Sequence, residues 1–334
     1  MALHGAALWR QVSKVVELKK NFRAACDPKF VNLLSRIRSG IAWNGEGTLS
    51  LQQKGTGDNY SLSDYEILSN RLLQRIGNDS EALERFKDAP IIVSHKTTRD
   101  AINIRKVKAF AESQQQEFCW YHSRDRYRRQ NVPEDQQCLI WTLRSSVTKD
   151  ALGLLPLVPG MKVMVTENVA IKANVVNGAE GVLMDIKYET DQFGRRYAVC
   201  AYVHIQGSNM QAPGLPYEVV PILPVSTSFR YTQAGGLCFN ISRWQLPLLP
   251  AYAYTDYKSQ GRSLDNVIID LTHCYSLQSA YVMLSRARSL EGLAILRPFN
   301  PRKINQRLPE EFRNEFARLN TLNVHTLVEY EASQ

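Results

Sequence analysis

The sequence predicts an α/β fold, a parallel sheet with helices on both faces, interrupted by a β-rich insertion. Two apolar runs, at residues 89–94 and 267–271, predict strands of the sheet. Each run is followed by a stretch whose apolar residues have helical spacing. A third observation predicts the insertion, since short strand patterns alternate with turn signals between these two runs. The sheet is therefore expected to combine two parts of the chain that are distant in sequence.

The change of pattern along the chain also sets the expected domain bounds. Residues 1–112 and 246–334 are expected to form the sheet domain, and residues 113–245 the insertion, with a small β-barrel at about residues 156–210. Crossover connections between the parallel strands are expected to be right-handed. Phosphate-facing groups are expected at the carboxyl ends of the strands, which form the usual ligand edge of open α/β sheets.

The first part of the chain alternates between strand and helix signals. Residues 15–18 have the pattern of a short strand, and residues 27–40 predict a helix whose first turn holds an Asp-Pro pair. Residues 45–58 are rich in glycine and polar residues and predict a loop. Further helices are expected over residues 63–73 and, after the first apolar run, over residues 98–112.

The middle of the chain predicts irregular structure followed by β-structure. Residues 114–150 contain few periodic apolar positions, so irregular structure or an excursion from the main domain is expected there. Residues 160–165, 181–188 and 196–205 have strand patterns. The pair Asn177-Gly178 predicts a hairpin turn between the first two of these strands.

Composition is that of an ordinary globular protein. Hydrophobic residues make up 44% and charged residues 22% of the 334 residues. No apolar run approaches the roughly 18 residues that cross a bilayer, so no membrane partner is expected. The 6 cysteines and 6 histidines are scattered without ligand spacing, so we expect free thiols and no metal site.

The charge of the chain favours a polyanionic partner. The formal net charge is +9, and residues 96–129 hold nine basic residues against four acidic ones. Aromatic residues are interleaved in the same segment, and bases can stack on such rings while cations follow the phosphates. These aromatic residues are Phe110, Phe118, Trp120, Tyr121 and Tyr127. A solvated helix face beside the edge of a core would give the same pattern.

The stretch that follows the insertion holds a dense group of polar residues between two apolar runs. Lys258, Ser259 and Gln260 offer an ammonium, a hydroxyl and an amide within one turn. Gly261 allows the backbone to approach a ligand closely. This combination suits phosphate groups. The stretch therefore predicts a phosphate-facing turn ahead of a buried strand and a helix.

This stretch resembles the last two signature motifs of superfamily-one DNA helicases of the RecD and petite-integration-frequency type, which include the helicases of Helitron transposons. The first motif has the form Thr-x-His-Lys-Ser-Gln-Gly, and Tyr257 stands in place of its histidine. The residues that match it are Thr255, Lys258, Ser259, Gln260 and Gly261. The second motif has the form Tyr-Val-x-Leu-Ser-Arg. The residues that match it are Tyr281, Val282, Leu284, Ser285 and Arg286.

The resemblance implies a RecA-like second motor domain of the P-loop NTPase fold and a role for each matching residue. Arg286, together with Arg23 near the N-terminus, is implied to contact the γ-phosphate of ATP as the catalytic pair. Gln260 and Gly261 would lie at the nucleotide edge. Six residues would contact single-stranded DNA or couple it to that edge. They are Thr255, Lys258, Ser259, His95, Arg99 and Asn103.

The insertion carries a resemblance of its own. Its Pro-Gly-Met-Lys-Val-Met string at residues 159–164 is followed by Asn168 and by the spacing Asn177-Gly178-x-x-Gly181. These features resemble the barrel that is inserted into the second motor domain of the same helicases. A β-module of another kind would also fit the strand patterns alone.

The P-loop of such enzymes is not found in the sequence. No Gly-x-x-x-x-Gly-Lys-Ser/Thr string occurs, and no apolar strand pattern ends in paired acids suited to Mg²⁺. The resemblance implies ATP and Mg²⁺ as cofactors of the intact enzyme. The main ATP-binding groups are therefore expected outside this chain, in an N-terminal RecA-like motor domain in cis or in trans. We expect no useful ATP hydrolysis from this chain alone.

Three hypotheses stay open at this stage. The chain is the C-terminal portion of an ATP-dependent helicase that moves 5′ to 3′ along single-stranded DNA, either as a fragment or as a degenerate copy. Alternatively, it is a non-catalytic nucleic-acid-binding remnant of a transposon-derived helicase, or a pseudogene product without a selected role. A role on DNA would place it inside the cell, in the nucleus of a eukaryotic host.

Overall fold

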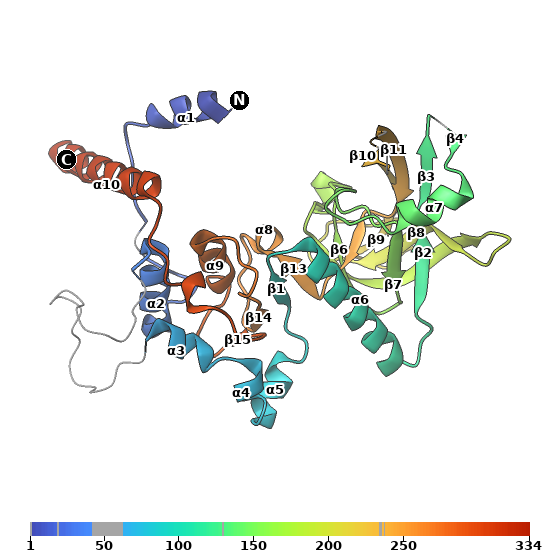
Figure 1. The fold of residues 1–334 in the computed structure, drawn as a ribbon, viewed down its shortest axis with the longest axis horizontal. Helices are drawn as coiled ribbons and strands as arrows, with labels where there is room; N and C mark the ends of the chain where they lie inside the picture. Colours follow the sequence, from blue (N-terminus) through green and yellow to red (C-terminus); the bar gives the residue numbers. More distant parts are fainter. Residues whose placement is uncertain (1, 19, 42–62, 129, 234–235, 237) are drawn as a thin grey trace.

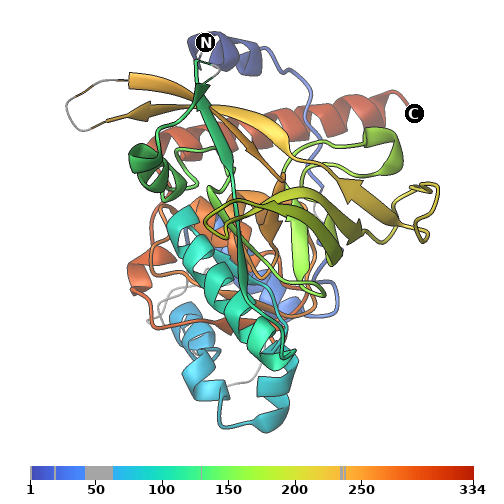
Figure 2. The ribbon, with the colours of Figure 1, turned by 90° about the vertical axis from the view of Figure 1, so that its right-hand side faces the viewer.

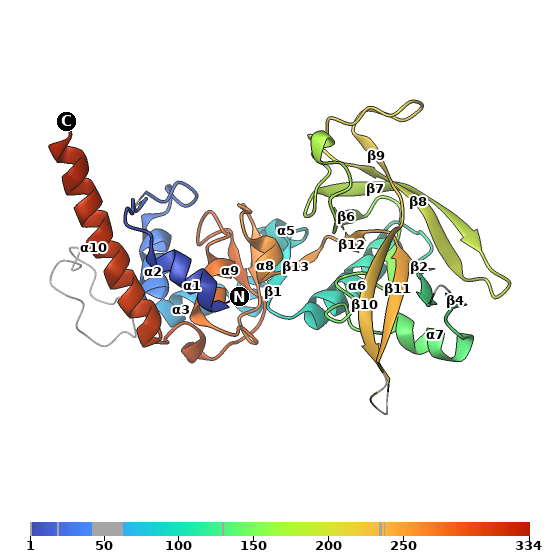
Figure 3. The same ribbon diagram turned by 90° about the horizontal axis from the view of Figure 1, so that it is seen from above.

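The molecule consists of two bodies that lie side by side, a sheet covered by helices and a β-rich body (Figure 1). The long helix α10 lies at the end of the molecule away from the β-rich body (Figures 1 and 3). The computed structural model describes residues 2–18, 20–41, 63–128, 130–233, 236 and 238–334. The loop expected at residues 45–58 lies outside the described residues.

The first body contains a parallel sheet of four short strands in the order β13-β1-β14-β15. The strands are β1 (Ile91–Val93), β13 (Ala253–Thr255), β14 (Val267–Ile269) and β15 (Leu293–Ile295). Every residue in them is buried, as expected for parallel strands with helices on both faces. The chain leaves this sheet after β1 and returns at β13. The predicted α/β fold with a parallel sheet is confirmed.

Helices pack on both faces of the parallel sheet. They are α2 (Pro28–Ser39), α3 (Asp64–Ser69), α4 (Leu73–Ile76), α5 (Ser80–Phe86), α6 (Lys96–Ser113) and α9 (Leu277–Leu284). The helix α10 (Glu310–Ala332) contributes no described residue to the two apolar cores of this sheet. Ile92 and Ile269 share an apolar core with α2 and α9. Their neighbours Ile91 and Ile268 belong to a second core with residues of α5 and α6. Alternate residues of each strand therefore face opposite helix layers, which fixes the register of the sheet.

The start and end of α2 follow the predicted signals. Asp27 caps the helix by accepting a hydrogen bond from the Phe30 amide at 2.9 Å, and Pro28 occupies the first turn. Gly40 ends the helix with a φ of 71°. A Cβ at Gly40 would also lie 2.9 Å from the backbone nitrogen of Leu308, so both conformation and space require glycine.

The strand expected at residues 15–18 is not formed. This segment has no regular secondary structure and lies along α10 instead. The backbone amide of Val15 donates to Thr326 Oγ1 at 3.1 Å, and that of Glu17 donates to Asn323 Oδ1 at 2.9 Å. These amides are thus satisfied by helix side chains rather than by a neighbouring strand.

The β-rich body contains two further sheets. Its strands are β2 (Cys119–His122), β3 (Arg124–Tyr127), β4 (Gln130–Asn131), β5 (Leu154–Leu157), β6 (Lys162–Val165), β7 (Glu180–Thr190), β8 (Arg196–His204), β9 (Val219–Ile222), β10 (Val225–Thr232), β11 (Cys238–Gln245) and β12 (Leu248–Pro250). One sheet has the order β12-β6-β7-β8-β2-β5 and curls until its end strands β12 and β5 meet. The other has the order β10-β11-β3-β4, and its hairpin β10–β11 extends outward (Figure 2).

Residues 114–150 form an excursion from the parallel-sheet body, one of the two expected alternatives, whereas the other alternative, irregular structure, is wrong. This span forms β2, β3, β4 and the helix α7 (Glu134–Trp141). Polar residues such as Arg124 and Arg126 alternate along β3 with the buried Asp125, so no apolar pattern marks the strand. The partner of β3 is β11, which lies more than a hundred residues further along the chain.

Asn177-Gly178 forms a turn between two antiparallel strands, as the hairpin signal predicted, but the connection is longer than the pair itself. β6 and β7 pair antiparallel, and residues 166–179 connect them. Gly178 has a φ of 96°, and the Asn177 amide donates to Asn168 Oδ1 at 2.9 Å. A Cβ at Gly181 would lie 2.4 Å from the carbonyl oxygen of His204 in the adjacent strand. Asn177, Gly178 and Gly181 together therefore form the turn that leads into β7.

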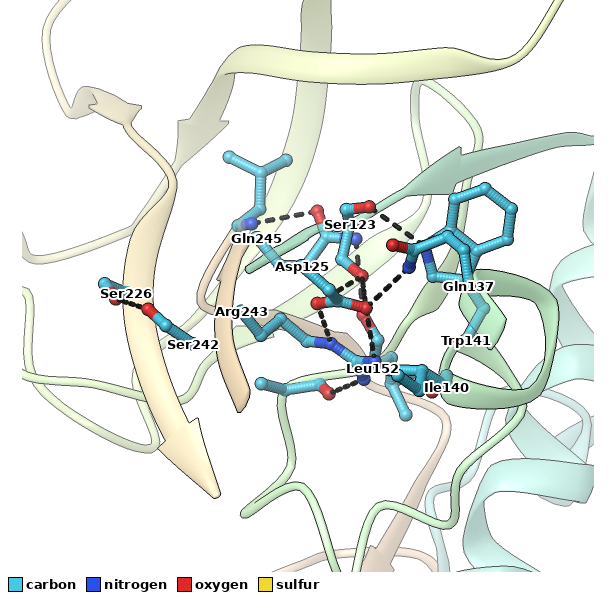
Figure 4. Close-up of polar contacts among 12 residues, drawn as sticks. Ser123, Asp125, Gln137, Ile140, Trp141, Leu152, Ser226, Ser242, Arg243 and Gln245 are labelled. Carbon is cyan, nitrogen blue, oxygen red and sulfur yellow. Dashed lines mark hydrogen bonds and ion pairs between the residues drawn. The ribbon is translucent and has the colours of Figure 1, made fainter. Parts of the chain in front are cut away.

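A fully buried ion pair holds the elements of the β-rich body together (Figure 4). Arg243 donates to both carboxylate oxygens of Asp125, at 2.8 and 2.9 Å, and neither side chain is exposed. Ser123 and Gln137 donate to the same carboxylate at 3.1 and 2.8 Å. The guanidinium also donates to two backbone carbonyls. Because each charged atom has a partner, the core tolerates the two charges.

Candidate functional site

Arg23 and Arg286, which are distant in sequence, lie together at one surface of the parallel-sheet body. Arg286 follows the end of α9 and is only 7% exposed, with Nε donating to the Val282 carbonyl at 2.8 Å. Arg23 Nη1 donates to the carbonyl of Ser285 at 2.9 Å, and its Nε donates to Ser263 Oγ at 2.7 Å. The predicted convergence of the two guanidinium groups is therefore seen in the structure.

The charges of this arginine pair are not neutralised within the described part of the chain. Neither guanidinium forms an ion pair with a described carboxylate, and the partners of both are carbonyl and hydroxyl oxygens. Burial and the neighbouring Arg23 lower the pKa of Arg286. Two adjacent cations without a counter-ion form a favourable site for an anion, and the planar fork of arginine suits phosphate.

The turn at Gln260–Leu264 lies against the arginine pair. The Leu264 amide donates to the Arg286 carbonyl at 2.9 Å, and Leu264 forms a parallel bridge with Ala287. Gln260 is exposed. Gly261 has a φ of 86° with open space around it, which favours glycine on conformational grounds. Gln260 and Gly261 are thus open to solvent beside the arginine pair.

The arginine pair does not lie at the edge of the sheet where phosphate-facing groups were expected. Leu264, its neighbour, directly precedes β14, so the pair lies towards the amino ends of β14 and β15. The reason is that α9 follows β14 and runs back along it, which carries Arg286 to the opposite end of the strands. The expectation of a carboxyl-end site is therefore wrong for these two arginines.

Other predicted residues do lie at the carboxyl ends of the strands. Val93 is in register with Thr255, so the residues after β1 and β13 share one edge. Thr255 is buried at the end of β13, and the short helix α8 (Asp256–Ser259) leads from it towards Gln260. Ser259 is also buried, and its hydroxyl donates to the Asp256 carbonyl at 2.7 Å. Ser259 therefore helps to hold the turn, and both side chains are buried rather than open to a ligand.

Lys258 and Arg262 connect this turn to the β-rich body. Lys258 is partly exposed, donates to Asn177 Oδ1, and has a pKa lowered by burial. Arg262 forms an ion pair with Glu180 and donates to the Gly178 carbonyl at 3.0 Å. Its guanidinium also lies 4.5 Å from the ring centre of Tyr254. Sequence reasoning missed these contacts, because no spacing signal links residues so far apart.

Arg99 and Asn103 are buried and occupied by internal contacts, unlike His95. Arg99 is 0% exposed and forms ion pairs with Asp100 at 2.6 Å and with Asp150 at 2.9 Å. Asn103 is 2% exposed. Neither side chain has a free surface from which to contact DNA, so the structure gives them positioning roles instead. His95 is partly exposed at the end of β1.

Asn103 takes the place of a neighbouring strand at the edge of the parallel sheet. The Ala253 amide donates to Asn103 Oδ1 at 2.8 Å, and Asn103 Nδ2 donates to the Ala253 carbonyl at 3.3 Å. Asn103→Ala would leave both backbone groups of Ala253 unpaired in a buried place. We expect a loss of about 1–3 kcal/mol in the free energy of unfolding, measured by urea denaturation. Glu112→Ala, at an exposed position of the same helix, is the control and should change it by less than about 0.5 kcal/mol. An equal effect of both variants would contradict this role.

Within the described ranges, no group of three or more His, Cys, Asp or Glu side chains gathers as metal ligands. All six cysteines are described, and each is a free thiol. No helix in the described part of the chain is both long and apolar enough to cross a bilayer.

Comparison with known sequences gives relatives that include proteins named as Pif1 DNA helicases. No family model matches the chain. An ATP-dependent DNA helicase PIF1 from Danio rerio is 36% identical over 151 residues, covering 45% of this chain and 20% of that protein. One of the same name from Xenopus laevis is 34% identical over 306 residues, covering 89% of this chain and 37% of that protein. The chain thus spans between about a fifth and two fifths of the length of these relatives.

Solved structures give the same kind of match at the level of the fold. The Pif1 helicase from Candida albicans superposes with a TM-score of 0.58 at 22% identity, covering 90% of this chain and 60% of that one. The Pif1 helicase from Bacteroides in complex with ADP-AlF3 and single-stranded DNA also gives 0.58, at 23% identity, covering 91% and 56%.

The parallel sheet, the curled second sheet and these structural matches define an α/β domain with a RecA-like fold. The sequence matches identify the family, because the chain belongs to the Pif1-type helicases. The resemblance drawn from the two motifs is thereby confirmed.

Proposed function

We propose that this chain is the second motor half of an ATP-dependent DNA helicase that moves 5′ to 3′ along single-stranded DNA. One observation carries the proposal, namely that Arg23 and Arg286 converge beside an open turn without a described carboxylate to neutralise them. Membership of the Pif1-type family supports the same reading. The relatives are named as ATP-dependent DNA helicases, and we extend that activity to the protein of which this chain forms part.

The arginine pair fits the phosphate end of ATP. ATP, when bound, supplies the phosphoryl group that is transferred. Arg286 and Arg23 would contact the γ-phosphate and stabilise the negative charge on its oxygens, with Gln260 and Gly261 at the edge of the same site. No string in this sequence provides a P-loop, so we assign the phosphate cradle and the Mg²⁺ ligands to an N-terminal RecA-like motor domain, in cis or in trans.

Single-stranded DNA would run along the carboxyl ends of the parallel strands. Lys258 is partly exposed there, and α8 connects it directly to Gln260. His95 lies on the same edge after β1. A Bacteroides Pif1 structure of the same fold contains single-stranded DNA, which supports this class of ligand. Thr255 and Ser259 would act from within, by holding the turn that joins the DNA side to the arginine pair.

A second function is a non-catalytic nucleic-acid-binding remnant of a transposon-derived helicase. The absence of a P-loop string from the sequence and its net charge of +9 favour this alternative. Both functions predict binding to single-stranded DNA that weakens with salt. They differ in the assay of ATP hydrolysis with a P-loop motor domain, since the remnant would give no DNA-stimulated turnover.

Lys258→Ala tests the DNA side of the proposal. If Lys258 neutralises one phosphate, its removal should weaken binding to an oligothymidine and reduce the slope of log affinity against log salt by about 1. Fluorescence anisotropy across a salt series measures both quantities. Lys87→Ala serves as the control, because Lys87 is exposed at the end of α5 and already paired with Glu84. A slope unchanged by Lys258→Ala would remove this residue from the phosphate contacts.

A further inference from the structure

Three aromatic rings gather at the carboxyl ends of two neighbouring strands, β1 and β14. The ring centres of His95 and Tyr275 are 4.6 Å apart with an angle of 67° between the planes. Those of His95 and His273 are 5.6 Å apart at 65°. His95 follows β1, whereas His273 and Tyr275 follow β14, which pairs with β1. We call these three residues the ring cluster.

The ring cluster faces solvent. Tyr275 is 69% exposed and His273 is exposed, while His95 is partly buried between them. The three rings meet edge to face, so His95 does not cover Tyr275 by stacking on it. A large aromatic surface is therefore open to solvent at the edge where the parallel strands end.

The loop that carries His273 and Tyr275 is held in place on both sides. Between them, Cys274 is buried in the core and its amide donates to the Leu271 carbonyl at 3.2 Å. Asp270, at the start of the loop, accepts from the Thr272 amide at 3.0 Å and forms an ion pair with Arg297 at 2.7 Å. The Tyr275 hydroxyl is hydrogen-bonded to His95 Nδ1. Rings that are already ordered lose little conformational entropy when a ligand stacks on them.

A cation accompanies the ring cluster. Lys303 Nζ donates to the carbonyl of Cys274, the residue between the two exposed rings, at 2.7 Å. Within the described residues Lys303 has no carboxylate partner at ion-pair distance, whereas nearby Arg297 is paired with Asp270. Exposed rings with an unpaired ammonium beside them match the two parts of a nucleotide in a single strand, the base and the phosphate.

The ring cluster and the arginine pair lie at opposite ends of the strands. His95, His273 and Tyr275 follow the carboxyl ends of β1 and β14, whereas Arg286 lies beside Leu264, ahead of β14. A ligand on the ring cluster would therefore not compete with a phosphate at the arginine pair. The DNA-side residue Lys258 follows β13, on the same edge as the ring cluster.

We propose that the ring cluster of His95, His273 and Tyr275 stacks one base of single-stranded DNA, while Lys303 contacts the adjoining phosphate. The inference rests on the proposed function, since it names the part of the DNA strand that this edge recognises. Neither helicase motif includes His273, Tyr275 or Lys303. The ring cluster would contact the flat face of the base. Because every base has such a face, binding should not depend on the base sequence.

The test compares two oligomers of equal length, an oligothymidine and one that carries abasic sugars throughout, by fluorescence anisotropy with the full chain. Wild-type protein should bind the oligothymidine more tightly by about 5-fold or more, the effect of one stacked base. Tyr275→Ala should abolish this preference without weakening binding to the abasic oligomer. Tyr275→Phe, which keeps the ring, should preserve it. Tyr330→Ala is the matched control, because Tyr330 is 60% exposed on α10.

The outcomes separate this inference from the proposed function. If Tyr275→Ala keeps the full preference, the ring cluster does not stack the base, and DNA binding by the chain still stands. If the wild-type protein binds both oligomers equally, the ring cluster again does not stack a base, and DNA binding by the chain still stands. If the wild-type protein binds neither oligomer, the DNA-binding function and the ring cluster proposal both fail.

Discussion

Replacing Arg286 by alanine is expected to lower DNA-stimulated ATP hydrolysis by about 10³-fold or more. The reason is that its guanidinium is fixed by Val282 and Ser285 yet has no described carboxylate partner, so its charge is available to a phosphate. The measurement uses this chain joined in one polypeptide to the P-loop motor domain of a Pif1-type relative. Turnover is followed with and without single-stranded DNA.

Two variants define the specificity of this result. Arg288→Ala removes a guanidinium only two residues away, which is exposed and paired with Asp265, and turnover should stay within about twofold. Arg286→Lys keeps the charge but loses the planar fork, and most of the activity should be lost. Turnover within about twofold of wild type for Arg286→Ala would show that this arginine does not act on the γ-phosphate.

Asp125→Ala is expected to lower the free energy of unfolding by about 3–5 kcal/mol, because it leaves Arg243 as an unpaired charge in the core. Urea denaturation of the full chain measures the change. Arg124→Ala is the control, since it breaks the exposed pair with Glu189 and the contact with the Tyr197 ring and should cost less than about 1 kcal/mol. A loss below about 1 kcal/mol for Asp125→Ala would mean that water or a rearranged partner satisfies Arg243.

The same pair offers a second variant with the opposite expectation. Replacing Asp125 and Arg243 together by leucine and methionine removes both charges and retains much of the volume. Such double replacements are often neutral or stabilising, so most of the loss seen in Asp125→Ala should be recovered. If the double variant has as low a free energy of unfolding as Asp125→Ala, the loss comes from Ser123 and Gln137 instead. Their hydrogen bonds to Asp125 are lost in both variants.

Elements with local signals could be predicted from the sequence. The helix after Asp27 and the pairs of a buried strand and a following helix were found because caps and apolar spacing act within a few residues. The elements that were missed depend on distant partners. β3 pairs with β11, and residues 15–18 bond to α10, more than 300 residues away. No local pattern carries that information.

The candidate site divides in the same way. The motif around Gln260 and Arg286 could be read directly, and its convergence with Arg23 was expected only through the family resemblance. The basic and aromatic segment was misleading in part. Arg99 is buried against Asp150, and Tyr121 belongs to the core of the β-rich body, so these residues serve packing rather than DNA contact.

The position of the arginine pair shows what topology adds to a motif. A site at the carboxyl ends of the strands follows from the general rule for open α/β sheets. In this chain the helix between β14 and β15 carries Arg286 back to the amino ends, while Lys258 and the ring cluster stay at the carboxyl ends. The proposed nucleotide side and the proposed DNA side are thereby separated by the length of the strands and joined through α8.

The central claim is that Arg23 and Arg286 act together on one phosphate. DNA-stimulated ATP hydrolysis of Arg23→Ala, Arg286→Ala and the double variant, each joined to the same P-loop domain, tests it most directly. Residues that act as a unit are strongly non-additive, so the double variant should turn over within about twofold of Arg286→Ala alone. A double variant whose loss equals the product of the two single losses would contradict the claim, because the two arginines would then act independently.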